Sequence, residues 1–427
     1  MPNKRKYIYV YADWIKLGGA TFMGTLSVDR VRGNEVFAFN YDERWLASGN
    51  AQQLDPELQL YSGEQFLSDG KSNFGVFTDS CPDRWGRILM KRREAILTRQ
   101  NNQPVKKLYE SDYLLGLFDG NRMGALRFKL DPKGAFLNDN SQLATPPWSN
   151  LRELEQASLH LEEDGIENTS DYLKWLNMLI SPGSSLGGAR PKASVVDEQK
   201  NLWIAKFPSR YDDGDTGAWE MVAHAIAIDA GVEMSECVIK KYNSPNHTFL
   251  TKRFDRTNDN KRIHFCSAMT CLNKIDGQDD SSYLELAEFI SINGCRVKHD
   301  LEQLWRRIVL SICISNTDDH LRNHGFILKN NGWQLSPAYD INPITDGEGL
   351  NLNINEFDNS QDLDLALSVI NHFRISQIRA EEVIKQVIKA TSNWRVIATK
   401  YGISSFKQDL KSRAFRVSVE YIKNTLS

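Results

Sequence analysis

The stretch SNTDDHLRNHGFILKNNGWQLSPAYDINP, residues 315–343, is the strongest chemical signal in the sequence, and it follows an apolar segment with helical periodicity. Asp318 and Asn323 stand five positions apart, and Asp340 comes later, at the end of a strand-like segment. Phosphoryl transfer needs a carboxylate to orient the attacking hydroxyl and oxygen ligands for Mg²⁺, and protein kinases use this same offset. The spacing therefore predicts a phosphoryl-transfer loop, although Asp and Asn also cap helices and fill turns.

A Gly/Ser-rich loop lies upstream, in SPGSSLGGARPKASVV at residues 181–196. Gly187 and Gly188 let the backbone approach phosphate closely, and Lys192 adds positive charge. The loop enters a predicted strand rather than a helix, so it is not the P-loop of nucleotide triphosphatases. A plain connection between a helix and a strand remains the alternative.

Two further segments supply groups that a nucleotide site uses. Lys206 ends the apolar strand of NLWIAKF and needs a counter-charge, an anionic ligand or an edge position that reaches water. The helix predicted at residues 218–230 carries Glu220 near its start. TFLTKRFDRTN, residues 248–258, predicts a strand followed by a connector whose backbone could bind a flat heterocycle. The serial order is that of a kinase site, although the usual HRD, DFG and GxGxxG motifs are absent.

Hydrophobic patterning predicts a mixed α/β part followed by a mainly helical part. We expect short antiparallel strands within residues 7–48, a helix from Asp83 as N-cap to Gln100, and a surface excursion at 131–150. Further helices are predicted at 151–161, 282–293, 300–315, 379–401 and 405–425. The predicted domains are an accessory β-rich part (1–150), the rest of an amino-terminal lobe (151–270) and a helical carboxy-terminal lobe (271–427).

Composition limits the possible partners and the compartment. Lys plus Arg number 52 and Asp plus Glu number 55 among 427 residues, a net charge of -3, so no chain-wide basic field exists to hold nucleic acid. The six cysteines form no CxxC pair, which argues against a zinc ribbon or a disulfide framework. No run of about 18 apolar residues occurs. We expect a cytoplasmic protein.

Taken together, these motifs resemble the HipA family of toxin–antitoxin serine/threonine kinases. The resemblance rests on the SxxGxxxK loop, on WIAKFPS and FLTKRFDR, and on NTDDHLRNHGF followed by LSPAYDINP. SCPDRWGRILMKRRE and the first strands resemble the accessory amino-terminal part of the family. The resemblance implies an α+β, bilobed protein-kinase-like fold, with an extra β-rich subdomain, an all-helical carboxy-terminal lobe, and ATP and Mg²⁺ as cofactors.

The resemblance also implies roles for the upstream residues. Lys206 is expected to pair with the nucleotide phosphates and with Glu220. Backbone around Lys252 to Phe254 is expected to hold the adenine, and Asp255 the ribose.

In NTDDHLRNHGF, which resembles the catalytic loop of the family, Asp318 is expected to be the base and His320 to support the loop. Asn323 and Asp340 are expected to ligate Mg²⁺.

In the Gly-rich loop, Ser185, Gly187, Gly188 and Lys192 are expected to contact the nucleotide. Ser185, or Ser184 beside it, is expected to be autophosphorylated and thereby to silence the kinase.

As a member of such a family, the chain would be a growth-inhibiting toxin linked to persistence. Its expected substrate is a translation factor such as an aminoacyl-tRNA synthetase. Its expected partner is a helix-turn-helix antitoxin, which would provide the only link to DNA.

Two other readings stay open at this point. Asp318, Asp319, His320 and His324 could form the ligand set of a metal-dependent hydrolase, with the two histidines four residues apart on a helix. Asn, Asp and Gly325 disfavour a regular helix here, and oxygen and amide ligands suit Mg²⁺ better than zinc. The other reading is a kinase-like corepressor that only docks a DNA-binding antitoxin.

Overall fold

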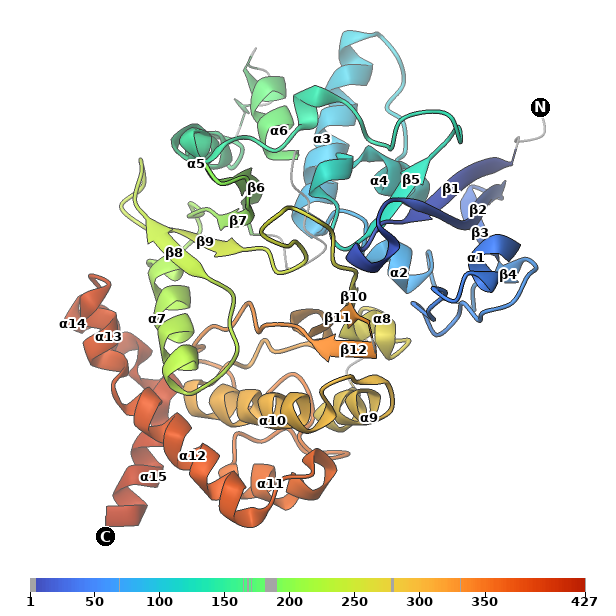
Figure 1. Ribbon diagram of the computed structural model, residues 1–427. Helices are drawn as coiled ribbons and strands as arrows, with labels where there is room; N and C mark the ends of the chain where they lie inside the picture. The colour runs from blue at the N-terminus through green and yellow to red at the C-terminus, as the bar shows by residue number, and fades with distance from the viewer. Residues whose placement is uncertain are drawn as a thin grey trace. The chain divides into compact units, whose positions relative to one another are not determined.

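A computed structural model of the chain describes residues 5–426 except 69, 164, 167–168, 170, 181–189, 278–279 and 331. The predicted loop residues Ser184, Ser185, Gly187 and Gly188 lie outside the described residues. The chain divides into two compact units (Figure 1). Unit 1 comprises Met1–Arg210, Lys252–Cys266 and Asn273–Ile275, and unit 2 comprises Tyr211–Thr251, Ser267–Leu272 and Asp276–Ser427. The three-part division expected from the sequence stays a prediction.

Unit 1 begins with a five-stranded antiparallel sheet in the order β4-β3-β2-β1-β5. The strands β1, β2 and β3 confirm the short antiparallel strands predicted within residues 7–48. The β2–β3 hairpin turns at Arg32 and Gly33, whose φ angles of 50° and 82° lie in the left-handed region that a tight hairpin turn requires. The strands are β1 (Lys6–Ala12), β2 (Thr21–Val31), β3 (Asn34–Tyr41), β4 (Gln65–Phe66) and β5 (Leu126–Lys129).

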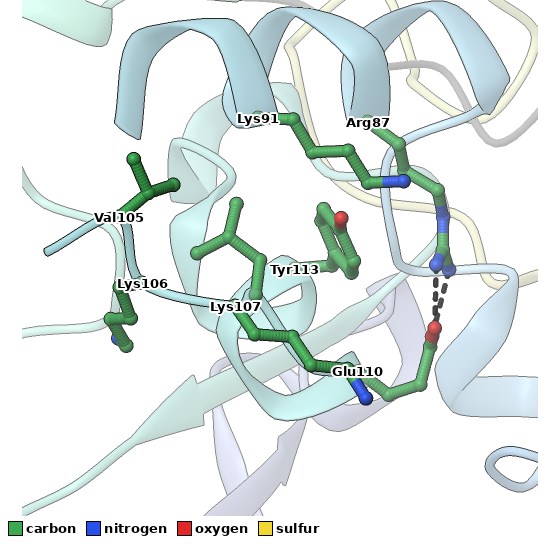
Figure 2. A pocket seen from close by; sticks show the side chains of 8 residues that line it. Arg87, Lys91, Val105, Lys106, Lys107, Glu110 and Tyr113 are labelled. Carbon is green, nitrogen blue, oxygen red and sulfur yellow. Dashed lines mark hydrogen bonds and ion pairs between the residues drawn. The ribbon is translucent and has the colours of Figure 1, made fainter. Parts of the chain in front are cut away.

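Helices and a second strand pair complete unit 1. Asp83 caps α3 as predicted, since its side chain accepts a hydrogen bond from the Gly86 N–H at 2.8 Å. Arg87 on α3 forms two hydrogen bonds with Glu110 on α4, at 2.6 and 2.8 Å, and so ties the two helices together (Figure 2). The further elements are α1 (Glu43–Ala47), α2 (Gly75–Thr78), α3 (Arg84–Gln100), α4 (Glu110–Gly116), α5 (Leu151–His160), α6 (Tyr172–Ile180) and the antiparallel pair β6 (Lys192–Val196) and β7 (Leu202–Lys206).

Unit 2 is built around α10 (Val297–Ile314), which is buried from Leu301 to its end except for Glu302. It packs against α9, α11, α12, α15 and β12, and Figure 1 shows it between the β11–β12 hairpin and α11. That hairpin is an addition to the part expected to be all helical. The elements are α7 (Thr216–Asp229), β8 (Cys237–Lys240), β9 (Thr248–Lys252), α8 (Ala268–Cys271), α9 (Tyr283–Asn293), β11 (Gly325–Lys329), β12 (Gly332–Leu335), α11 (Leu363–Ser368), α12 (Gln377–Ser392), α13 (Trp394–Lys400), α14 (Ser405–Lys411) and α15 (Arg416–Leu426). The strand β10 (Phe265–Ser267) has its first two residues in unit 1 and its last in unit 2.

Two carboxy-terminal helices predicted as continuous are each divided. Asn393 ends α12 and begins α13, and the hydroxyls of Thr391 and Ser392 bond carbonyls three or four residues back, which weakens the helix just before the break. The break seats Trp394 in the core, where its ring stacks on Phe415 at 4.2 Å. Residues 405–425 form α14, a short 3-10 helix and α15 rather than one helix.

The expectations from composition concern cysteines and membranes. All six cysteines have free thiols, and four of them are buried. Among the residues that the structure describes, no helix combines the length and apolar character needed to cross a membrane. A cytoplasmic location stays a prediction.

Candidate active site

The end of α10 fixes the start of the 315–343 stretch in unit 2. Ser315 has a φ of 51° and closes the helix, and the Asn316 N–H donates to the Ser311 carbonyl at 2.9 Å. The Asn316 side chain then accepts a hydrogen bond from the Asn342 N–H at 3.1 Å. Because of this bond, the two ends of the stretch lie side by side at the end of a buried helix.

The five-residue offset between Asp318 and Asn323 is closed by hydrogen bonds. The Asn323 side-chain amide donates to the Asp318 carbonyl at 2.9 Å, and the His320 N–H donates to the same oxygen at 3.1 Å. The Asn323 N–H donates to the His320 carbonyl at 2.8 Å. This turn leaves the Asp318 side chain exposed and the Asn323 side chain buried. His320 supports the loop through its backbone.

Asp340 returns to this turn after the hairpin. The hydroxyl of Tyr339 donates to the Arg322 carbonyl at 2.9 Å, so the residue before Asp340 is fixed to the residue before Asn323. Asp340 is half-buried and has a φ of 59°, a left-handed conformation that Asp tolerates better than most residues. The chain thus brings together the segments that carry the predicted base and the predicted metal ligands.

The donor set of this turn fits Mg²⁺. The Oδ1 atoms of Asn323 and Asn342 are buried and have no hydrogen-bond partner within the described part of the chain. Together with the Asp340 carboxylate they are hard oxygen donors, which Mg²⁺ prefers. Asn323 and Asp340 are the residues that would hold the ion.

Asp319, Tyr283 and His324 form a buried cluster next to the turn, and its support of the loop was not predicted from the sequence. The carboxylate of Asp319 accepts a hydrogen bond from the Tyr283 hydroxyl at 2.5 Å and lies 3.0 Å from Nε2 of His324. Burial by itself would raise the pKa of Asp319, but His324 and the Tyr283 hydroxyl outweigh it and lower that pKa. Asp319 therefore stays ionised, and its contacts with Tyr283 and His324 fix the loop to the buried part of unit 2.

The geometry does not support the hydrolase reading. His320 and His324 flank a 3-10 helix, Leu321–Asn323, and β11 follows at once, so the two histidines do not share the face of an α-helix. His324 instead pairs with Asp319. Over the described ranges, no group of three or more His, Cys, Asp or Glu side chains is arranged to hold a metal ion.

Lys192 forms a buried ion pair in unit 1. Its ammonium lies 2.8 Å from the carboxylate of Asp83, and the two side chains are only 3% and 2% exposed. Burial raises the pKa of Asp83 even though Lys192 lowers it. A nucleotide contact by Lys192 would have to compete with this pair.

We expect Lys192→Met to lower the free energy of unfolding by about 3 kcal/mol, because it leaves the Asp83 carboxylate buried without its counter-charge. Urea unfolding measures the change, with Lys133→Met as the control at an exposed lysine of the same unit. The double variant Asp83→Asn/Lys192→Met should recover part of the loss. A single variant as stable as the native chain would contradict a structural role for the pair.

Lys206, the predicted phosphate-binding lysine, lies on a strand, and Glu220, its predicted partner, lies on a helix. Lys206 is the last residue of β7 and lies opposite Lys192 in the β6–β7 register. Glu220 is buried in the first half of α7. The two residues belong to different units, and their pairing stays a prediction.

The connector residues have partners within unit 1. The Lys252 ammonium lies 3.4 Å from the side-chain oxygen of Asn258, and the ring of Phe254 packs against that of Phe265. Asp255 is fully buried. Protein donors occupy both of its carboxylate oxygens, and its contact with the ribose stays a prediction.

Arginines around Asp255 organise a loop far away in the sequence. The Asp255 carboxylate accepts hydrogen bonds from Arg253, Arg256 and the Gly124 N–H, at 2.6 to 2.8 Å. Arg253 and Arg256 also donate to the carbonyl of Arg122, at 3.1 and 2.8 Å. The FDR motif that resembled a nucleotide-binding connector thus fastens residues 252–256 to the loop that precedes β5.

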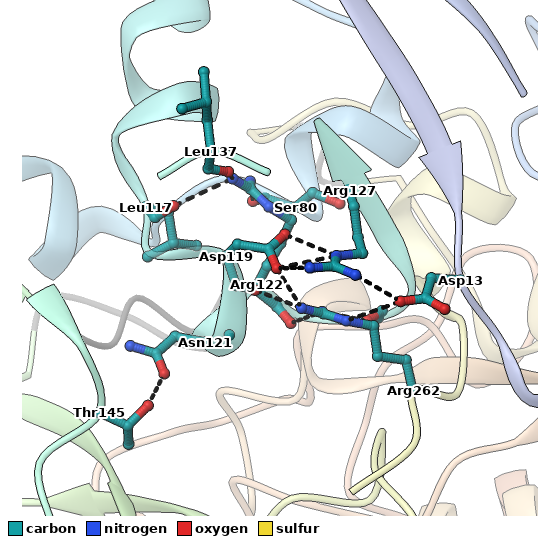
Figure 3. Close-up of polar contacts among 12 residues, drawn as sticks. Asp13, Ser80, Leu117, Asp119, Asn121, Arg122, Arg127, Leu137, Thr145 and Arg262 are labelled. Atoms are coloured by element: carbon teal, nitrogen blue, oxygen red, sulfur yellow. Dashed lines mark hydrogen bonds and ion pairs between the residues drawn. The ribbon is translucent and has the colours of Figure 1, made fainter. Parts of the chain in front are cut away.

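A second carboxylate extends this network. Figure 3 shows Arg127 and Arg262 converging on Asp119, whose Oδ2 lies 2.6 and 3.2 Å from their guanidinium nitrogens. Arg127 also reaches Asp13, at 3.1 Å. Burial would raise the pKa of Asp119, but the arginines lower it. Charged residues within the largely apolar segment LFDGNRMGALRF, residues 117–128, were the sequence signal that could have indicated this network.

Comparisons with known proteins agree with these observations. Residues 184–394 match the family model described as the HipA-like C-terminal domain. A Haemophilus influenzae protein named "Putative kinase" is 27% identical over 181 residues, which cover 37% of this chain and 52% of that protein. The chain thus spans about half the length of this curated relative.

Two solved structures extend the comparison. A chain of the Shewanella oneidensis MR-1 toxin–antitoxin complex of HipA, HipB and operator DNA is similar over 97% of both chains, with a TM-score of 0.67 and 16% identity. The Helicobacter pylori proinflammatory kinase CtkA covers 49% of this chain and 94% of its own at 16% identity, but its TM-score of 0.32 carries no argument. The expected α+β, kinase-like fold is confirmed. The chain has a fold similar to that of the HipA complex chain, and its residues 184–394 match the model of the HipA-like C-terminal domain.

Proposed function

We propose that this chain is an ATP- and Mg²⁺-dependent serine/threonine protein kinase that acts as the growth-inhibiting toxin of a toxin–antitoxin pair. The supporting observation is the closed turn in which Asn323 bonds the Asp318 carbonyl while Tyr339 holds Asp340 beside it. This turn lies inside the matched HipA-like domain. The turn also carries an exposed carboxylate together with buried oxygen donors, as phosphoryl transfer with Mg²⁺ requires.

Each residue of the turn has a separate role in the proposed phosphoryl transfer. The exposed Asp318 orients the substrate hydroxyl and accepts its proton at the carboxylate. Asn323 and Asp340 would hold Mg²⁺, which would supply positive charge to neutralise the nucleotide phosphates. Lys206, for which we propose Glu220 as the partner, supplies the positive charge that binds those phosphates. Rate enhancement then comes from positioning and electrostatics rather than from a covalent intermediate.

The partners follow from the relatives and from the charge. The similar Shewanella chain was solved with HipB and operator DNA, which supports a helix-turn-helix antitoxin as partner of this chain. A net charge of -3 supports DNA contact only through that antitoxin. We propose a translation factor such as an aminoacyl-tRNA synthetase as substrate. The second candidate function is a non-catalytic corepressor, and such a protein would not require the closed turn.

We propose that autophosphorylation of Ser185 or Ser184 inhibits the kinase activity. A phosphoserine adds about −1.5 to −2 charges, in the loop that we propose for the ATP phosphates. Repulsion would then reduce the affinity for ATP. Ser185→Asp should weaken ATP binding for the same reason.

Phosphoproteomics of cells that express the chain tests the proposal. Cells with the native chain should gain Ser or Thr phosphorylation on a small set of proteins and stop growing. Cells that express Asp318→Gln should do neither. Identical phosphoproteomes in the two cultures, with both proteins folded and equally abundant, would rule out the kinase in favour of the corepressor.

Gly347 offers a test of the loop position. A Cβ at Gly347 would overlap the side chain of Thr317, the residue before Asp318. We expect Gly347→Ala to lower phosphate transfer by about tenfold or more, because a small displacement of catalytic groups is costly. Gly214→Ala is the matched control, since a Cβ there meets nothing within 4 Å. Equal transfer rates in the two variants, measured with labelled ATP, would contradict the placement of the active loop.

A further inference from the structure

A pocket of about 480 Å³ lies in unit 1, between α3 and the segment that leads into α4 (Figure 2). Arg87 and Lys91 line it from α3, while Lys107 and Glu110 line it from the other side. Its volume falls within the range of sites for small molecules. None of the residues assigned to the proposed kinase site lines this pocket.

The charges around the pocket do not balance. Arg87 is neutralised by Glu110, and Lys106 lies 3.1 Å from the carboxylate of Asp112. Lys91 and Lys107 have no carboxylate within ion-pair distance among the residues that the structure covers. Two exposed ammonium groups without an ion-pair partner therefore line a space that is large enough for a ligand, and that of Lys107 lies 5.0 Å from the centre of the Tyr109 ring.

Tyr113 provides an independent observation. Its side chain is only 3% exposed, and its hydroxyl is buried without a hydrogen-bond partner among the described residues. Figure 2 shows its ring inside the pocket, between the α3 side chains and Lys107. The guanidinium of Arg87 stacks over the ring at 4.6 Å. A buried hydroxyl without a partner destabilises the folded chain, and a hydrogen bond to a ligand oxygen would remove that cost.

We infer that this pocket binds a phosphate monoester of a small organic molecule. The phosphate carries about two negative charges at neutral pH, which match the ammonium groups of Lys91 and Lys107. The Tyr113 hydroxyl donates to a phosphate oxygen. Leu108 and Val105 contact the organic group. A carboxylate ligand would compensate only one of the two charges.

Isothermal titration of the full chain with phenyl phosphate tests this inference. Lys91→Met and Lys107→Met should each weaken binding about tenfold, because each removes a charge-assisted hydrogen bond. Tyr113→Phe should weaken it about fivefold with no change in the circular dichroism spectrum. Lys16→Met, at an exposed lysine of the same unit, should bind like the native chain.

Several outcomes would overturn the assignment. One is the absence of saturable binding, and another is binding that the Lys91 and Lys107 variants leave unchanged. Benzoate or benzyl alcohol binding as tightly as phenyl phosphate would show that charge does not select the ligand. A phosphoserine peptide that binds more tightly than phenyl phosphate would assign the pocket to phosphorylated proteins instead. The kinase proposal is unaffected by each of these results, because it rests on other residues.

Discussion

Asp318→Asn is expected to lower the rate of phosphate transfer by about 10³-fold, with little change in thermal stability. The Asp318 side chain is exposed, so its replacement removes no buried interaction. What holds the loop is the Asp318 carbonyl, which accepts from Asn323 and His320 and is unchanged in the variant. The variant separates chemistry from folding, because only the carboxylate that accepts the proton is lost.

The measurement is transfer of labelled phosphate from ATP, with the melting temperature recorded on the same samples. Asp364→Asn is the control for an exposed carboxylate elsewhere in unit 2, and it should keep the native rate. Asp319→Asn should behave differently, since it breaks the buried contacts with Tyr283 and His324 and therefore lowers stability. A native rate in Asp318→Asn would refute the proposed base.

Local features were predictable from the sequence. The cap at Asp83, the hairpin at Gly33 and the turn between Asp318 and Asn323 depend on residues within a few positions of one another. Alternation and helical spacing likewise gave most of the elements, because they report which face of a segment is buried. The break at Asn393 was missed, since the apolar period continues across it and packing of Trp394 decides the division.

Partners far apart in the sequence were not predictable. Lys192 beside a Gly-rich loop indicated an anionic ligand, whereas its structural partner Asp83 lies 109 residues away. Asp319 looked like a metal ligand, and Tyr283, 36 residues upstream, explains its burial. In each case a charged residue in an apolar segment signalled the need for a partner, but only the tertiary structure identifies which one.

Asp255 illustrates this limit most fully and yields the largest expected effect on stability. Asp255→Asn should lower the free energy of unfolding by about 5 kcal/mol. The carboxylate is the anion that Arg253 and Arg256 share inside unit 1, and burial lowers the pKa of Arg256 well below its ordinary value. An amide of the same shape leaves both guanidinium groups buried without a counter-charge. The loop that holds Gly124 loses its anchor as well.

The effect of Asp255→Asn should also depend on pH in a definite direction. Burial alone would raise the pKa of Asp255, but Arg253, Arg256 and the Gly124 N–H outweigh it and lower the pKa from 3.8 to about 2. Because the folded pKa is the lower one, the carboxylate stabilises the native state fully above about pH 4, and this contribution is lost as the pH falls toward 2. The stability difference between the native chain and the variant, measured by urea unfolding, should therefore shrink between pH 5 and pH 2. Asp139→Asn, at an exposed site, should show no such trend, and a difference that stays constant or grows on acidification would mean that Asp255 is not the buried anion of this network.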